Sequence, residues 1–245
     1  MMIKRGQTTI FIIVGIAIVV AGILVYAFYP DIRSFVSGEI VANSYMRECM
    51  EGEIKPNVEL ISMQGGYANP EGFILHEGNK VKYLCYTAHY FVPCEGGVQQ
   101  PMLKNKFEKE LSLLLQEKSE QCAENLRQQF LKKGYSISEA LEVKTFAKLE
   151  PEKIVVNVNA PLTVKKETTQ TFREFNIEVP SKMYELVMTS MSIVDYESTY
   201  GDAATDIYMQ YYPNLRIVKT KLEDGSTIYE LEDVITKEKF KFASR

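Results

Sequence analysis

The sequence predicts an α+β protein in which a long N-terminal transmembrane helix extends into an α+β ectodomain with a mainly antiparallel sheet. Three observations lead to this prediction: an uncharged 20-residue segment, helical apolar spacing after it, and alternating apolar strands in the second half. The expected divisions are a cytoplasmic basic leader (1–6), a transmembrane helix (7–30), an extracellular continuation of that helix (31–64) and an ectodomain (65–245).

Charge is distributed unevenly along the chain. The first 30 residues contain Lys4 and Arg5 but no acidic residue, so all 32 acidic residues lie in 31–245. Because nucleic-acid-binding surfaces carry excess positive charge, this acidic distal part argues against a nucleic-acid binder.

The segment 10–29 carries the membrane prediction. It has no charged residue, and thirteen of its twenty side chains are Ile, Leu, Val or Phe. As a helix it would rise about 30 Å, the thickness of a bilayer core, which favours a membrane span over a buried core helix. Lys4 and Arg5 precede it, and the positive-inside rule then places the N-terminus in the cytoplasm and 31–245 outside the cell membrane.

The N-terminal residues Lys4-Arg5-Gly6-Gln7-Thr8-Thr9, followed at once by the apolar run, resemble a class III signal peptide. This is the signal of type IV pilins and archaeal pilin-like surface proteins. The resemblance implies a prepilin-type peptidase that cuts between Gly6 and Gln7 and leaves the apolar helix to assemble with other copies. Phe11 departs from the pattern, since many pilins have a glutamate at the fifth mature residue.

A second likeness lies further along the chain. The wider sequence, including Gln64-Gly65-Gly66-Tyr67, is similar to uncharacterised archaeal membrane proteins with this start, which implies a surface location but no activity. Two alternatives for the N-terminus stay open. One is an ordinary secretory signal cut after Ala27, and the other is an uncleaved signal anchor with the same topology as the pilin-like form.

The elements outside the predicted membrane span begin with a helix. Apolar residues recur at helical spacing over 32–50, which predicts that the first helix continues outward. Pro56 is expected to open a further short helix as its first residue, and Gly65 or Gly66 to end it. We interpret the paired glycines as a helix stop and turn rather than a ligand loop.

Two strands and a long helix are predicted next. The strands are 72–75 and 80–86, with a turn at 77–79, and the helix is 104–133, ended by Gly134. The helix has an apolar stripe made of Phe107, Leu111, Leu114, Cys122, Leu126 and Phe130.

The segment after Tyr135 is rich in predicted strands, at 142–149, 154–160 and 162–179. Apolar and polar residues alternate over 154–159, which indicates a sheet with one buried face.

The last part of the chain predicts one helix and a hairpin. The helix is 181–194, capped by Ser181. The hairpin pairs 215–222 with 227–234 around Asp224-Gly225. Phe240 and Phe242 then alternate with lysines, a pattern typical of an edge strand.

Four cysteines lie on the predicted outer side. We expect disulfides Cys85–Cys94, within a short loop, and Cys49–Cys122, between two helices. Buried free thiols are the alternative. A zinc site is less favoured because the chain has no CxxC and its two histidines lack metal-ligand spacing.

No catalytic or nucleotide-binding motif is present, so we expect no enzymatic activity, no cofactor and no metal. The acidic residues Asp195, Glu197, Asp202 and Asp206 lack EF-hand spacing, and a solvated acidic face is favoured over a calcium site. Tyrosines gather in the same region, where they suit either a core or a candidate interaction patch. The patch consists of Tyr196, Tyr200, Tyr208, Tyr211 and Tyr212.

The predicted function is that of a single-pass, pilin-like cell-surface protein whose extracellular domain serves assembly, adhesion or protein interaction. The expected partners are the lipid bilayer, the prepilin-type peptidase, and other copies or other surface proteins. The alternatives are an uncleaved envelope sensor or assembly subunit, and an exported enzyme of unrecognised class.

Overall fold

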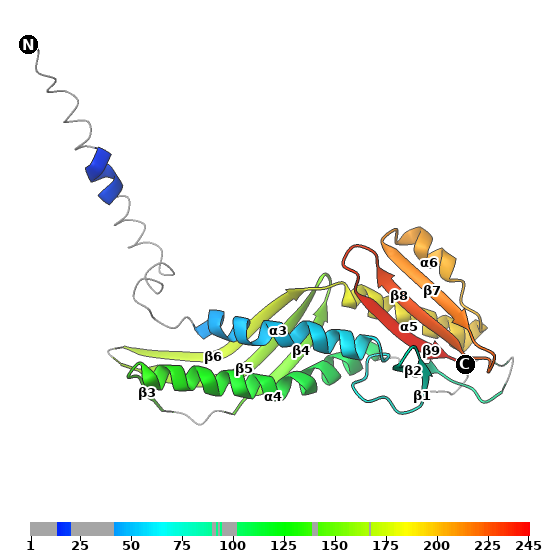
Figure 1. Cartoon of the computed structure of the whole chain (residues 1–245), viewed down its shortest axis with the longest axis horizontal. Coiled ribbons are helices and arrows are strands. Elements are labelled where there is room, and N and C mark those ends of the chain that lie inside the picture. The colour runs from blue at the N-terminus through cyan, green and yellow to red at the C-terminus, as the bar shows by residue number, and fades with distance from the viewer. Residues whose placement is uncertain are drawn as a thin grey trace, which may run out of the picture. The chain divides into compact units, whose positions relative to one another are not determined.

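The computed structural model describes residues 14–20, 42–89, 92, 94, 102–138, 142–166 and 168–245. The chain divides into two units, 1–45 and 46–245. The first contains a helical segment at 14–20 and the start of the next helix, and the second contains all the remaining elements. Figure 1 shows these elements with the labels used below.

The predicted long transmembrane helix is wrong, because no helix among the described residues is both long and apolar enough to cross a bilayer. Of the predicted span, the structure describes residues 14–20, which are helical and rise about 10 Å. Helix α3 (Ala42–Ser62) is long enough but carries charges such as Arg47, Glu48 and Glu51. The other parts of the predicted span, and 31–41, lie outside the described residues.

Helix α3 also corrects the prediction of a new helix at Pro56, which lies inside it. A proline inside a helix costs about 3 kcal/mol, since it removes a hydrogen bond and crowds the preceding turn. Ile54, Val58 and Ile61 lie on both sides of Pro56 and are all buried. Each buried side chain of this kind contributes roughly 1.5–3 kcal/mol, so their burial outweighs the proline.

The predicted stop after α3 is confirmed. Gly65 and Gly66 adopt φ values of 70° and 87°, and the Gly66 N–H donates to the Ile61 carbonyl at 2.8 Å. A side chain at Gly65 would bring its Cβ within 2.7 Å of the Lys82 Cβ on a neighbouring strand. These glycines therefore form a closely packed turn.

Helix α4 (Leu103–Lys132) confirms the long predicted helix and lies beside α3 in Figure 1. Its stripe is buried as expected, except that Leu115 rather than Leu114 is fully buried.

Four antiparallel strands form one sheet: β3 (Ser136–Ile137), β4 (Lys144–Glu150), β5 (Lys153–Lys165) and β6 (Thr169–Pro180). Strand β5 is central, with β3 and β4 on one side and β6 on the other. Its burial alternates along its whole length, which confirms the predicted one-sided sheet. Strand β5 continues through Pro161 by a register shift between Asn159 and Leu162, so the predicted single strand 162–179 belongs to two strands.

Helix α4 covers the outer edge of β4 with hydrogen bonds from the strand's backbone. Acceptors four residues apart on a helix are about 6 Å apart, close to the spacing of alternate residues in a strand, about 6.6 Å. The three bonds run from Leu149 N to Glu108 Oε1, Ala147 N to Ser112 Oγ and Thr145 N to Gln116 Oε1, at 2.8, 2.8 and 3.0 Å.

A second, five-stranded sheet has the order β1-β2-β9-β8-β7. The strands are β1 (Phe73–His76), β2 (Asn79–Cys85), β7 (Leu215–Lys221), β8 (Thr227–Asp233) and β9 (Lys239–Ser244). The two predicted hairpins are confirmed, β1–β2 and β7–β8. Strand β2 pairs with β9 in parallel, so this sheet is mixed rather than antiparallel.

The predicted edge position of β9 is wrong, because it lies between β8 and β2. Its Lys241 is 1% exposed, and its ammonium group reaches Glu230 at 2.7 Å and Glu77 at 2.9 Å. A carboxylate on the neighbouring strand β8 and one in the β1–β2 turn thus allow a lysine inside a central strand.

Two helices pack on this second sheet. Helix α5 (Met183–Tyr200) extends six residues beyond its predicted end and packs against β8 and β9, and α6 (Thr205–Tyr211), which was not predicted, packs against β7. The N-cap of α5 is Lys182 rather than the predicted Ser181, although the Ser181 hydroxyl, one residue earlier, accepts a hydrogen bond from Met183 N at 3.1 Å.

Candidate interaction surface

Both predicted disulfides are present. Cys49 on α3 is bonded to Cys122 on α4, and Cys85 at the end of β2 is bonded to Cys94, with Cα–Cα distances of 6.0 and 5.7 Å. These distances lie within the usual range for disulfides. The four cysteines are therefore neither free thiols nor metal ligands.

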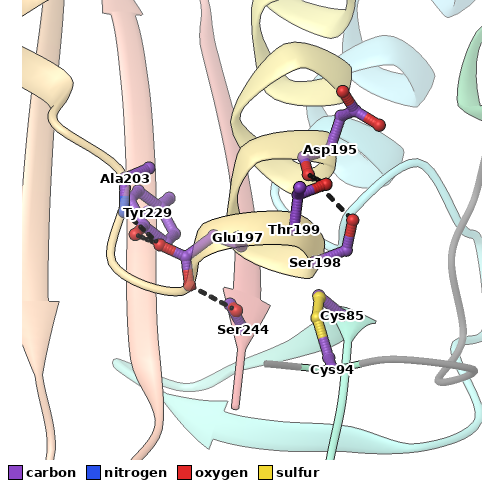
Figure 2. The surroundings of a disulfide bond; sticks show 9 residues. All are labelled: Cys85, Cys94, Asp195, Glu197, Ser198, Thr199, Ala203, Tyr229 and Ser244. Carbon is purple, nitrogen blue, oxygen red and sulfur yellow. Dashed lines mark hydrogen bonds between the residues drawn. A yellow bond between two sulfur atoms is a disulfide. The ribbon is translucent and has the colours of Figure 1, made fainter. Parts of the chain in front are cut away.

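A buried carboxylate lies near the Cys85–Cys94 disulfide, as Figure 2 shows. Glu197 accepts hydrogen bonds from the Tyr229 hydroxyl, from Ser244 Oγ at 2.9 Å and from Ala203 N at 2.7 Å. Burial, and then the hydrogen bond and charge of Glu197, raise the pKa of Tyr229, so its hydroxyl remains a donor. Both carboxylate oxygens are thus used to hold α5 to the second sheet.

The predicted acidic face is correct only in part. Asp195, Asp202 and Asp206 are exposed, but Glu197 is directed inward. Asp202 forms ion pairs with Lys219 and, at 2.9 Å, with Lys221, and these two hydrogen bonds lower its pKa. Within the described part of the chain, no group of three or more His, Cys, Asp or Glu side chains could hold a metal ion.

The five tyrosines of the candidate patch fall into two groups. Tyr196 and Tyr200 lie at the end of α5 with ring centroids 4.9 Å apart, and Tyr200 is 73% exposed. Tyr208, Tyr211 and Tyr212 lie on or directly after α6, where Tyr211 and Tyr212 are 78% and 58% exposed. Four of the five are exposed and Tyr208 is half-buried, so most of the patch lies at the surface rather than in the core.

A cavity of about 430 Å³ lies between α5, α6 and the start of β7, and its volume lies within the usual range for ligand sites. Tyr208 and Tyr212 line it, together with Tyr184, and the Tyr208 hydroxyl lies 2.9 Å from Ser192 Oγ on α5. We call this cavity the tyrosine groove. Its apolar and aromatic lining residues are Tyr184, Leu186, Met188, Tyr208, Tyr212, Pro213 and Leu215.

Sequence reasoning identified two of these tyrosines but missed the groove. Tyr184 and Met188 are one helical turn apart on α5, a spacing that could have indicated a shared face. Their approach to Tyr212 and Pro213 depends on the packing of α5 and α6 around β7, which no local pattern reveals. Tyr196, Tyr200 and Tyr211 do not line the groove.

A second cavity, of about 730 Å³, lies between α3, the ends of β5 and β6, and the β8–β9 connection. Its lining includes the buried Ile54, Val58 and Ile154 and the exposed Lys55 and Lys237. The predicted processing site, Gly6 and Gln7, lies outside the described residues.

No protein-family model, curated protein or solved structure matches this chain.

Proposed function

We propose that the chain is an exported surface protein with pilin-type processing, and that 46–245 acts outside the cytoplasm by binding other proteins. The pairing of all four cysteines carries this proposal, because disulfides form and persist chiefly in oxidising compartments. Other copies of the chain and other surface proteins are the proposed partners.

The tyrosine groove supports interaction as the mode of action. Tyrosines bury a large area at low entropic cost and are enriched at protein interfaces. Tyr212, which lines the groove, is 58% exposed, so a partner that enters the groove would cover it.

The export proposal can be tested on intact cells. A Glu223→Cys variant places a thiol on the exposed β7–β8 turn of a chain whose own cysteines are paired. A membrane-impermeant maleimide should label this variant in intact cells and should not label the parent chain. Labelling that requires lysis would place the domain in the cytoplasm and contradict the proposal.

The processing proposal rests on the residues around Gly6 and predicts a native chain that begins at Gln7. Mass spectrometry of the native protein measures this directly. An intact Met1, or a chain that begins at Phe28, would contradict pilin-type processing.

The interaction proposal can be tested by photo-crosslinking in cells. A photoreactive phenylalanine at Tyr212 should crosslink the domain to a partner or a second copy, whereas the same group at Glu223, away from the groove, should not. Equal crosslinking at both positions, or none at Tyr212, would contradict the groove as the contact surface.

A further inference from the structure

The tyrosine groove contains a carboxylate with an unused oxygen. Glu185, in the first turn of α5, accepts a hydrogen bond from Glu152 N at 3.2 Å through Oε1. Its Oε2 is buried and has no hydrogen-bond partner among the described residues. A charged acceptor without a hydrogen bond is costly, so this half-buried carboxylate would gain by turning toward a donor brought into the groove.

The charged side chains that line the groove have a net negative charge. Asp233 also lines it and is used by its own loop, since its Oδ1 accepts from the N–H groups of Ile235 and Thr236. The one lysine in the lining, Lys182, directs its ammonium group to Glu152 at 2.7 Å and also attracts Glu185 and Asp233, so the two lining carboxylates exceed it by one negative charge. A cation is therefore the ligand charge that complements this groove.

The rest of the lining suits the stem of a long cationic side chain. Tyr184, Tyr208 and Tyr212 supply aromatic rings, and Met188 and Leu215 supply apolar surface. Lysine and arginine bury their methylene groups on such surfaces and place their charged ends on a carboxylate or an aromatic face.

We propose that the groove binds a lysine- or arginine-bearing segment of a partner protein, with the cation at the Glu185 carboxylate and the stem against the tyrosines. This inference rests on the proposed function, because it assigns a ligand chemistry to the same surface. An acidic segment would meet two carboxylates, and a purely apolar one would leave Glu185 Oε2 without a hydrogen bond.

Ligand-observed NMR on the full-length protein tests the proposal with two probes. They are acetyl-Ala-Ala-Lys-Ala-Ala-amide and its analogue with norleucine, which has a similar stem but no charge. A charge-assisted hydrogen bond should make the lysine probe bind about tenfold more tightly. Added salt should weaken the lysine probe more than the norleucine probe.

Two variants separate the charge from the apolar surface. Glu185→Gln keeps an acceptor for Glu152 N and should abolish the preference for lysine, whereas Glu223→Gln, the same change on an exposed turn, should retain it. Tyr212→Ala should weaken both probes. Its side chain is 58% exposed, so the variant should still fold.

The outcomes distinguish this inference from the proposed function. Equal binding of both probes, no binding of either, or a preference that survives Glu185→Gln would overturn the cationic ligand. Crosslinking from Tyr212 in cells would still support an interaction surface in each of those cases. Loss of crosslinking together with a retained lysine preference would instead contradict the proposed function.

Discussion

Replacing Glu197 by alanine should destabilise the second sheet strongly. The carboxylate accepts three hydrogen bonds, from Tyr229, Ser244 and Ala203, and the residue is 9% exposed. A buried donor left without its acceptor costs about 1–3 kcal/mol, and two buried hydroxyls and one N–H group would be affected. Because such losses are not additive, we expect a total of roughly 3–5 kcal/mol.

Urea unfolding followed by tyrosine fluorescence and circular dichroism measures this loss. The chain has no tryptophan and 15 tyrosines, so tyrosine emission can be observed without interference. Tyr229→Phe, which removes one of the bonds, should cost about 1–2 kcal/mol. Glu223→Ala, on an exposed turn, should stay within about 0.5 kcal/mol. A loss below about 1 kcal/mol for Glu197→Ala would refute the structural role of this carboxylate.

Two further predictions concern the disulfide between the helices and the charge on Asp202. Replacing Cys49 and Cys122 together by alanine should cost about 4 kcal/mol from their sequence separation of 73, measured by urea unfolding, and an unchanged midpoint would contradict it. Asp202 has a pKa below its usual 3.8, through the hydrogen bonds from Lys219 and then Lys221, so its contribution to stability is present above that value. This contribution is lost as the pH falls through the lowered pKa. Asp202→Asn should therefore unfold with a weaker pH dependence in this acidic window than the parent chain, and an unchanged pH profile would argue against the ion pairs.

The alternation of apolar and polar residues predicted the strands and helices in which buried side chains recur at the regular spacing of a strand or a helix. Strand β5 alternates buried and half-buried residues as its sequence suggests, and the stripe of α4 faces inward. The errors occurred where a distant contact outweighed a local signal. Pro56 favours a helix start in the local sequence, yet burial on both sides keeps α3 continuous.

Strand β9 illustrates the same limit for sheets. Its alternating lysines indicate an edge, but Glu230 on β8 and Glu77 in the β1–β2 turn neutralise Lys241. The parallel pairing with β2 joins segments more than 150 residues apart, and no short-range signal encodes it.

The sequence predicted which kinds of residue form the candidate site better than it predicted where their side chains lie. The exposure of Tyr211 and Tyr212 agrees with a surface patch, and the cysteine pairs followed from helix and loop spacing. The inward turn of Glu197 and the buried oxygen of Glu185 depend on the packing of α5 against distant strands. A sequence shows that such carboxylates exist but not which of them lacks a partner.

The bonds between α4 and β4 have a consequence for solubility at high local concentration. An open strand edge is a template on which another chain can add a strand, and such addition leads to aggregation. Glu108, Ser112 and Gln116 occupy the N–H groups that an incoming strand would need. Crowded copies of this protein are thus prevented from adding a strand at β4.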